Sequence, residues 1–170
     1  MKPIRAITYG VLLTIGAAYS GTATFAGGTV ILRDNDADQC NLPVPEPGQE
    51  KTYSFVNGEA LPCGKDWNDK ARTFQLGEVP SATTVLIATN RNCWNTSMPE
   101  DAPWFLLKTI KKLTSTNIIE IAYLASFSEN QIIEPGLQMV EFKRSDVNRD
   151  KISCIRIKTS AAPPIPSTAP

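Results

Sequence analysis

Carboxylates and cysteines are the residues of this chain that could do chemistry, because its 170 residues include no histidine. Catalysis by Ser-His-Asp or Cys-His groups is thereby excluded, and so are zinc sites that need histidine. A pair of carboxylates of the glycosidase kind needs no histidine and stays open. Asp66, Asp69 and Glu120 are nominal candidates for such a pair. Since no spacing in the sequence brings them together, no catalytic residue is assigned.

Two acidic segments suggest calcium before any other ligand. Asp34–Asp38 and Asp146–Asp150 alternate oxygen-bearing side chains as the opening of an EF-hand loop does. Neither segment has the glycine at the sixth place or the glutamate at the twelfth. Asp and Asn are also common in turns, because their side chains bond the local backbone. Solvated turns are therefore favoured over calcium sites.

The N-terminal segment has the parts of a cleavable secretory signal. Lys2 and Arg5 form a positive start, and Ala6–Tyr19 is an apolar stretch without charge. Small residues follow, so cleavage is expected before Gly27. Cuts after Ser20 and after Ala23 are the alternatives.

A retained membrane anchor is the competing interpretation of residues 1–26. It is disfavoured because a spanning helix needs about 20 apolar residues, more than this run supplies. Residues 1–26 are thus predicted to be a signal peptide, and the protein to be secreted or periplasmic with no membrane span after cleavage. The mature chain loses two cations and keeps 15 basic against 17 acidic residues. This mild negative charge argues against a nucleic-acid partner, which needs a basic face.

The four cysteines, Cys40, Cys63, Cys93 and Cys154, all lie in the mature chain. No two have CxxC spacing, and a zinc site would need four scattered thiolates, which is unusual in an exported protein. They are predicted to form two structural disulfides. Three connectivities are open on the sequence alone.

Short apolar runs between turn residues dominate residues 27–158, which are predicted to form one mostly-β domain. The runs are rich in β-branched and aromatic residues and several alternate with period two. The predicted strands are Thr29–Leu32, Lys51–Val56, Thr73–Leu76, Thr83–Ala88, Asn117–Phe127, Leu137–Lys143 and Lys151–Lys158.

One segment has helical spacing instead. Ser97–Glu100 has the form of a capping box. Beyond it four apolar residues recur at helical spacing: Leu106, Leu107, Ile110 and Leu113. The sequence therefore predicts one inserted helix over 98–113. The last residues, 159–170, carry four prolines and are predicted to be a disordered tail.

Two halves of the mature chain match each other, which predicts an internal repeat of 28–77 and 78–158. Asn68–Leu76 lies over Arg149–Ile157, each an Asp-Lys turn that leads into a strand. The runs that begin at Thr29 and Thr84 also correspond. The second copy is longer by 26 residues between these landmarks, about what the inserted helix requires.

The repeat also suggests which cysteines pair. One bridge in each copy would join Cys40 with Cys63 and Cys93 with Cys154. On the loop-entropy model such bridges are worth about 3 to 4 kcal/mol each. Pairing between the copies stays open.

The chain resembles the βγ-crystallin-like domains in two features. One is the pair of turn-strand segments, and the other is Leu76–Thr83 with the strand that follows it and ends at Asn92–Cys93. The resemblance covers most of residues 28–158. Bacterial members of that family include secreted peptidase inhibitors and calcium-binding modules. The resemblance implies a Greek-key β-sandwich of two crystallin-like motifs.

In that family calcium sits in a turn of the form Asn/Asp-Asn/Asp-x-x-Ser/Thr-Ser. Asn68–Thr73 has Arg72 where a ligand oxygen is expected, and Arg149–Cys154 keeps Ser153 but begins with arginine. Calcium binds about six to eight oxygens, and a neighbouring cation repels it. Both turns therefore look impaired, and Asp150 and Ser153 are only weak metal candidates.

Loops are the candidate contact segments, because a rigid scaffold commonly presents binding residues on them. Three are proposed: Asp34–Asp38, Ala60–Asp66 and Arg91–Thr96. Asp36, Trp67 and Trp94 are the candidate partner-binding residues. Tryptophans are more often core residues, but these two lie in polar, turn-like segments near cysteines.

The sequence favours an exported non-enzymatic binding protein, with an inhibitor of a secreted hydrolase as its specific form. One alternative is an exported carboxylate-dependent enzyme or toxin. Another is a structural calcium-binding envelope module. The expected partner is an extracytoplasmic protein, and no cofactor other than calcium is suggested.

Overall fold

The computed structural model describes residues 27–56, 62–95, 102–143 and 151–161. The predicted signal, residues 1–26, lies outside them. Within these ranges the protein is mainly β, as predicted, and its paired strands are antiparallel. No helix in the same ranges has the length and apolar character needed to cross a membrane.

Sheet A has four strands in the order β2-β1-β4-β9. Their bounds are β1 (Thr29–Arg33), β2 (Gln39–Pro43), β4 (Thr73–Gly77) and β9 (Ile119–Glu120). Buried and more exposed residues alternate along β1, β2 and β4. Because successive side chains of a strand point to opposite faces, sheet A has one apolar and one polar face.

Sheet B has six strands in the order β10-β11-β7-β6-β12-β3. Their bounds are β3 (Glu50–Ser54), β6 (Thr84–Ala88), β7 (Trp104–Thr109), β10 (Ile132–Glu134), β11 (Leu137–Lys143) and β12 (Cys154–Lys158). The remaining described elements are the paired β5 (Val79–Pro80) and β8 (Leu113–Thr114) and the 3-10 helices η1 (Lys65–Trp67) and η2 (Ile121–Ser126).

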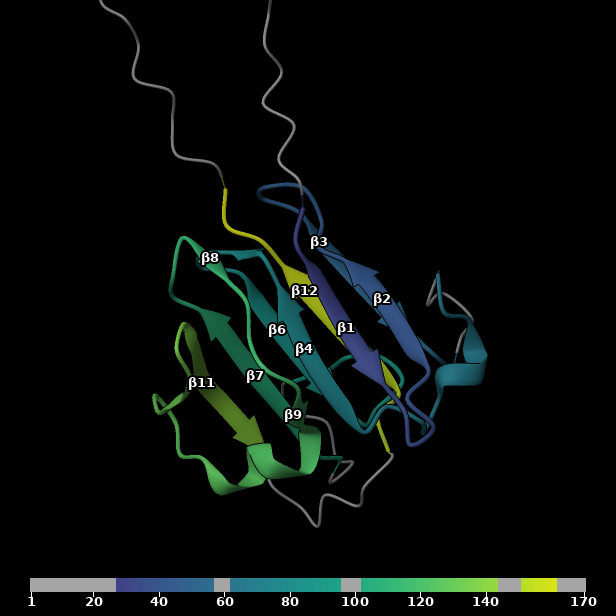
Figure 1. Cartoon of the computed structure of the whole chain (residues 1–170). Helices are drawn as coiled ribbons and strands as arrows, with labels where there is room; N and C mark the ends of the chain where they lie inside the picture. Colours follow the sequence, from purple (N-terminus) through teal and green to yellow (C-terminus); the bar gives the residue numbers. More distant parts are fainter. Residues whose placement is uncertain (1–26, 57–61, 96–101, 144–150, 162–170) are drawn as a thin grey trace, which may run out of the picture.

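The two sheets lie face to face as the layers of a sandwich, and the main core fills the space between them (Figure 1). Each sheet has an apolar face that must be hidden from water, and stacking them hides both. Sheet A contributes Val30, Leu32, Leu42, Phe74 and Leu76. Sheet B contributes Tyr53, Val85, Ile87, Phe105, Leu107, Leu137, Met139, Ile155 and Ile157.

A second, smaller apolar cluster lies on the outer face of sheet B. It consists of Leu86, Ala88, Trp104 and the disulfide-bonded Cys93 and Cys154. The strands β6 and β7 are therefore apolar on both faces, whereas the outer face of sheet A is polar.

The predicted helix over 98–113 is wrong in its described part, where β7 pairs with β6 on one side and β11 on the other. Phe105 and Leu107 face the main core, and Trp104 and Leu106 face the second cluster. A strand covered on both faces is a continuous apolar run, which spacing alone does not distinguish from a buried helix. The capping-box residues lie outside the described ranges.

The predicted strand Asn117–Phe127 is confirmed only at β9. β9 pairs with the first two residues of β4, and the Ile121 N–H then donates to Arg72 O at 3.0 Å. Beyond this point β4 has no further residues to pair with, and the chain turns into η2. Ile121, Leu124 and Phe127 are buried at every third residue, which matches the three residues per turn of a 3-10 helix.

The other six predicted strands are confirmed within a few residues, as β1, β3, β4, β6, β11 and β12. The disulfides join Cys40 to Cys63 and Cys93 to Cys154, which confirms one bridge in each predicted copy. Their Cα–Cα distances of 5.5 and 5.3 Å are ordinary for disulfides. Two disulfides fit an extracytoplasmic protein, because oxidising compartments preserve them.

Thr159, which the sequence assigned to the Pro-rich tail, is instead buried. Its hydroxyl donates to Glu46 O at 2.6 Å, and its N–H donates to Gln49 O at 3.0 Å. The Gly48 N–H donates to Ser160 O at 2.9 Å. The chain is thus packed as far as Ser160, and residues 162–170 lie outside the described part.

Replacing Cys93 and Cys154 together by alanine is expected to lower the free energy of unfolding by about 4 kcal/mol, and the same change at Cys40 and Cys63 by about 3 kcal/mol. The first bond spans a sequence separation of 61 residues and the second one of 23, so the first restricts the unfolded chain more. Equilibrium urea unfolding of both variants measures the difference. A larger loss at Cys40 and Cys63 would contradict this ranking.

Tyr53 joins the two sheets through one hydrogen bond. It lies on β3 of sheet B, and its hydroxyl donates to Pro43 O of sheet A at 2.6 Å. Burial raises the pKa of the phenol above its ordinary value of 10.0, because the phenolate would be desolvated. The stability that this group contributes is therefore complete below the unfolded pKa and is lost as pH rises through the higher folded pKa.

The variant Tyr53→Phe should have a free energy of unfolding about 1 kcal/mol lower at neutral pH, because Pro43 O loses its donor. It should also lose less stability than the wild type above a pH of about 10. Urea unfolding at neutral pH and in alkaline buffer measures both effects. Parallel alkaline declines in the two proteins would show that another group causes the loss.

Candidate functional site

The acidic turn between β1 and β2 is held by its own hydrogen bonds. Asp34 Oδ1 accepts the N–H groups of Asp36 and Asp38, both at 2.9 Å, and Ala37 has a φ of 66°. These are the bonds of a turn capped by an aspartate side chain. Asp36, a predicted partner-binding residue, is exposed in this turn.

The turn before β4 is bonded to two other loops at the same end of the sandwich. The Asp69 N–H donates to Ile152 O at 3.1 Å, and the Arg72 guanidinium donates to Asn35 Oδ1. Arg72 stands where the family resemblance implies a calcium ligand. Its bond to Asn35 gives it a structural role in this chain.

Of the two weak metal candidates, Asp150 lies outside the described residues and Ser153 is buried. The Ser153 N–H donates to Ala88 O at 3.0 Å, and its carbonyl accepts the Phe55 N–H at 2.9 Å. In the part of the chain that the structure describes, no three Cys, Asp or Glu side chains are grouped so that they could hold a metal ion.

The two predicted binding tryptophans have different surroundings. Trp67, in η1, is half-buried and packs against the main core. Trp94 is 45% exposed, and Asn90 holds its backbone with two hydrogen bonds of 2.9 Å each. Cys93 beside it is bonded to β12. Trp94 is therefore an exposed ring on a firmly held loop, whereas Trp67 supports the core.

The three nominal catalytic carboxylates are exposed on different elements. Asp66 lies in η1 and Asp69 in the turn after it. Glu120, on β9, lines a groove with another acid, Glu134 of β10. The structure thus places Glu120 in the same groove as a carboxylate that the sequence did not suggest.

We call this groove the edge groove, because β9 and β10 are edge strands of the two sheets. Its volume is about 260 Å³. The residues that line it are Ile118, Ile119, Glu120, Tyr123, Ile133 and Glu134. The groove is therefore apolar with two acids.

Exposed apolar side chains are concentrated in the part of the chain that contributes most of the edge groove. Of the seven large apolar side chains that are exposed in the described structure, five lie between residues 110 and 132. They are Ile110, Leu113, Ile118, Tyr123 and Ile132, and Tyr123 is the most exposed at 58%. Scattered apolar residues are normal on a surface, but Ile118 and Tyr123 line one groove, and grouped exposed apolar side chains are typical of an interaction site.

Hydrogen bonds keep the segments of this surface side by side. The Glu134 carboxylate accepts the Asn117 N–H at 3.0 Å and its side-chain amide at 3.3 Å. The Ile110 N–H donates to Gly136 O at 2.9 Å, and the Thr114 hydroxyl donates to the same oxygen at 3.2 Å. The surface is thus built on a bonded framework.

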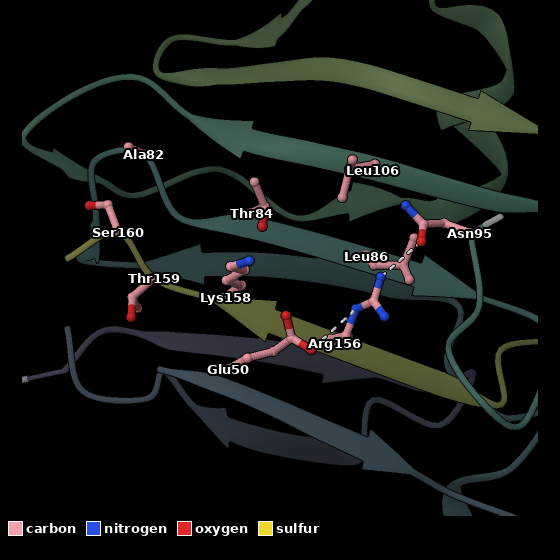
Figure 2. A pocket seen from close by; sticks show the side chains of 10 residues that line it. All are labelled: Glu50, Ala82, Thr84, Leu86, Asn95, Leu106, Arg156, Lys158, Thr159 and Ser160. Carbon is pink, nitrogen blue, oxygen red and sulfur yellow. Dashed lines mark hydrogen bonds and ion pairs between the residues drawn. The ribbon is translucent and has the colours of Figure 1, made fainter. Parts of the chain in front are cut away.

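A second groove, the sheet-B groove, runs over the outer face of sheet B and is shown in Figure 2. Its volume is about 390 Å³. It is lined by Glu50, Ala82, Thr84, Leu86, Asn95, Leu106, Arg156, Lys158, Thr159 and Ser160. Arg156 lies between Glu50 and Asn95, with Nε 3.9 Å from Glu50 Oε1 and Nη2 donating to Asn95 Oδ1 at 3.0 Å.

The sequence did not identify either groove. Ile119 and Tyr123 lie in the predicted strand Asn117–Phe127, and Ile110 and Leu113 lie in the predicted helix over 98–113. Arg156 and Lys158 follow each other at period two in a predicted strand, which places them on one face. That spacing was the available signal for the sheet-B groove.

Comparison of the chain with protein-family models, with curated proteins and with solved structures found no match. The function therefore has to be inferred from the chemistry of the two grooves. The edge groove carries carboxylates, whereas the sheet-B groove carries two cations and one acid.

The adjacent residues Ile118 and Ile119 provide a matched test of which side chains serve the fold. Ile118 is 56% exposed and Ile119 is 5% exposed. Ile118→Thr should change the free energy of unfolding by no more than about 0.5 kcal/mol. Ile119→Thr should lower it by about 2 kcal/mol, because it buries a hydroxyl in the core. Urea unfolding compares the two, and similar losses would mean that Ile118 is a packing residue.

Proposed function

We propose that this protein is an exported, non-enzymatic binding protein that holds a protein partner at the edge groove, in the specific form of an inhibitor of a secreted hydrolase. The signal pattern at the N-terminus and the two disulfides support export. The observation that carries the binding role is the apolar lining of the edge groove, in which Ile118 is 56% exposed and Tyr123 is 58% exposed.

A βγ-crystallin-like sandwich of two Greek-key motifs is part of this proposal. The strand pairing supports it. In the first half β1 pairs with β2 and β4, and in the second half β6 pairs with β7 and β12. In each half the fourth strand lies beside the first, as in a Greek key. The third strand of each motif, β3 in the first half and β9 in the second, joins the sheet of the other half.

The register of these pairs supports the internal repeat. Val30 is paired with Leu76, and Val85, its equivalent in the second copy, is paired with Ile157. In the sequence alignment Leu76 lies over Ile157, so both copies have the same register. Independent halves would have no reason to share it.

Part of the extra length of the second copy forms part of the edge groove. Between its third and fourth strands the second copy has η2, β10 and β11, for which the first copy has no counterpart. Tyr123 of η2 and Ile133 of β10 line the groove. An insertion that adds a binding surface leaves the scaffold itself unchanged.

The groove's chemistry indicates the partner segment that fits it. Tyr123 and the isoleucines offer apolar area, and Tyr is a common anchor of protein interfaces. Glu120 and Glu134 place negative charge beside it. A loop of the partner that combines an apolar side chain with lysine or arginine would be complementary.

Rigidity favours an inhibitor over a transient binder. The groove segments are bonded to each other by Asn117 and Glu134, and two disulfides restrain the rest of the chain. A surface that is already ordered loses less conformational entropy on binding. Tight binding by an interface of ordinary size depends on this preorganisation.

Purified secreted peptidases and glycosidases provide the test. The protein should inhibit at least one of them, and Tyr123→Ala should weaken inhibition by about tenfold or more. Trp94→Ala is the matched control, because Trp94 is also an exposed aromatic residue but lies outside the edge groove. Its inhibition constant should stay close to the wild-type value.

The outcomes separate the parts of the proposal. If Trp94→Ala weakened inhibition and Tyr123→Ala did not, the binding site would be the loop that carries Trp94 and not the edge groove. The inhibitor function would still stand. No inhibition of any hydrolase would remove the inhibitor proposal.

Glu120 and Glu134 in one groove favour a carboxylate-dependent enzyme as the second candidate. Such an enzyme would turn over a glycan substrate, and Glu120→Gln would abolish that turnover. Glycan turnover that is lost in Glu120→Gln would show that the protein is an enzyme and would contradict the non-enzymatic binding proposal.

A further inference from the structure

We propose that the sheet-B groove is a second binding site, which takes an extended acidic segment of a protein partner with two carboxylates spaced two residues apart. The site lies on the outer face of sheet B, away from the residues that line the edge groove. It does not depend on the hydrolase-inhibitor proposal, because none of its lining residues belongs to the edge groove.

The charge of the groove selects an acidic ligand. Arg156 and Lys158 are its cations, and Glu50 is the single acid among its lining residues. Two cations against one carboxylate leave a net positive site. Positive charge favours acidic partners and repels basic ones.

Arg156 is held ready for a carboxylate. Its Nη2 donates to Asn95, and its Nε faces Glu50. In the described part of the chain its Nη1 has no partner, so the end of the guanidinium can still donate. The side chain is 26% exposed, so this fork is partly shielded from water. A guanidinium fork matches the two oxygens of a carboxylate.

The spacing of the two cations matches an extended peptide. Arg156 and Lys158 are two residues apart on β12 and point to the same face, about 7 Å apart along the strand. An extended peptide that lies over β12 on the outer face of the sheet has the same period. Its alternate side chains therefore repeat at the same distance. Carboxylates at positions i and i+2 would therefore meet Arg156 and Lys158 together.

The floor and walls also favour a peptide. Leu86 and Leu106 form an apolar part of the floor, and the Thr84 hydroxyl lies beside Lys158 (Figure 2). None of the ten lining residues is aromatic. Among the described residues that line the groove, a nucleic-acid base or a sugar ring would thus have no aromatic face to stack on, whereas an extended peptide needs none.

Both ends of the groove are fixed in position. At one end Asn95 follows a loop that the Cys93–Cys154 disulfide ties to β12. At the other end Thr159 is held by Glu46 and Gln49. A groove with fixed ends is formed before the ligand arrives.

Binding is measured by fluorescence anisotropy with the full mature protein and a short labelled Glu-Ala-Glu peptide. The peptide should bind, and a Gln-Ala-Gln peptide should not. A Glu-Glu-Ala peptide has the same charge at the wrong spacing and should bind more weakly. Affinity should fall as salt is added, because the contact is electrostatic.

Four variants assign the binding to the groove. Arg156→Gln should weaken binding of the Glu-Ala-Glu peptide by about tenfold or more. Lys158→Gln should weaken it by about threefold. Glu50→Gln should strengthen binding, because it removes the acid that competes for Arg156. Lys70→Gln, an exposed lysine outside the groove, is the charge-matched control and should change nothing.

The opposite signs expected for Arg156→Gln and Glu50→Gln cannot arise from a loss of folding. Equal binding of the Glu-Ala-Glu and Glu-Glu-Ala peptides would contradict the proposal that the groove selects carboxylates two residues apart. Equal weakening by Lys70→Gln would show diffuse charge attraction instead of a site. Displacement of the peptide by a sulfated oligosaccharide that itself binds more tightly would assign the groove to a glycan and overturn the peptide proposal.

Discussion

Two backbone ladders hold β12 between β6 and the edge strand β3, and most of the structure depends on the register that they set. All five residues of β12 pair with β6 on one side and with β3 on the other. Because side chains alternate along a strand, this register turns Ile155 and Ile157 into the core and Cys154, Arg156 and Lys158 outward. A slip by one residue would exchange the two sets. The core, the Cys93–Cys154 bond and the sheet-B groove would then be lost together.

The two grooves lie on different kinds of framework. The sheet-B groove is built on the paired strands β3, β6, β7 and β12, so its side chains are positioned by extended ladders. The edge groove is built on the short elements β9, η2 and β10, which the bonds between Asn117 and Glu134 connect. Edge strands have unpaired backbone groups and are natural places for contact with other chains. The opposite charges of the grooves suit them to different partners.

Local pattern predicted most of the longer strands, but it missed β2, although buried and exposed residues alternate along it. Buried and partly exposed residues alternate along β1 and β4, and both strands were predicted. β7 is covered on both faces, so its apolar run has no alternation and was mistaken for a helix. The segment after Glu120 has alternating apolar residues but no strand beside it to pair with, and it forms η2 instead. In both places the structure depends on which segments pack or pair beside the strand. Local sequence does not contain that information.

The sequence by itself determined the mainly β class and six of the strands, because these follow from local spacing. The match between the two halves suggested both disulfide pairings but did not exclude pairing between the halves. The sequence also placed Trp94 on an exposed loop. Only the tertiary structure decided the two grooves, because each gathers residues that are far apart in the chain. Strand order brings Glu50 to Arg156 and places Glu120 and Glu134 in one groove, and spacing in the sequence does neither. Carboxylates and cysteines were the residues singled out for chemistry; the fold made the cysteines structural and gave two of the carboxylates a shared groove.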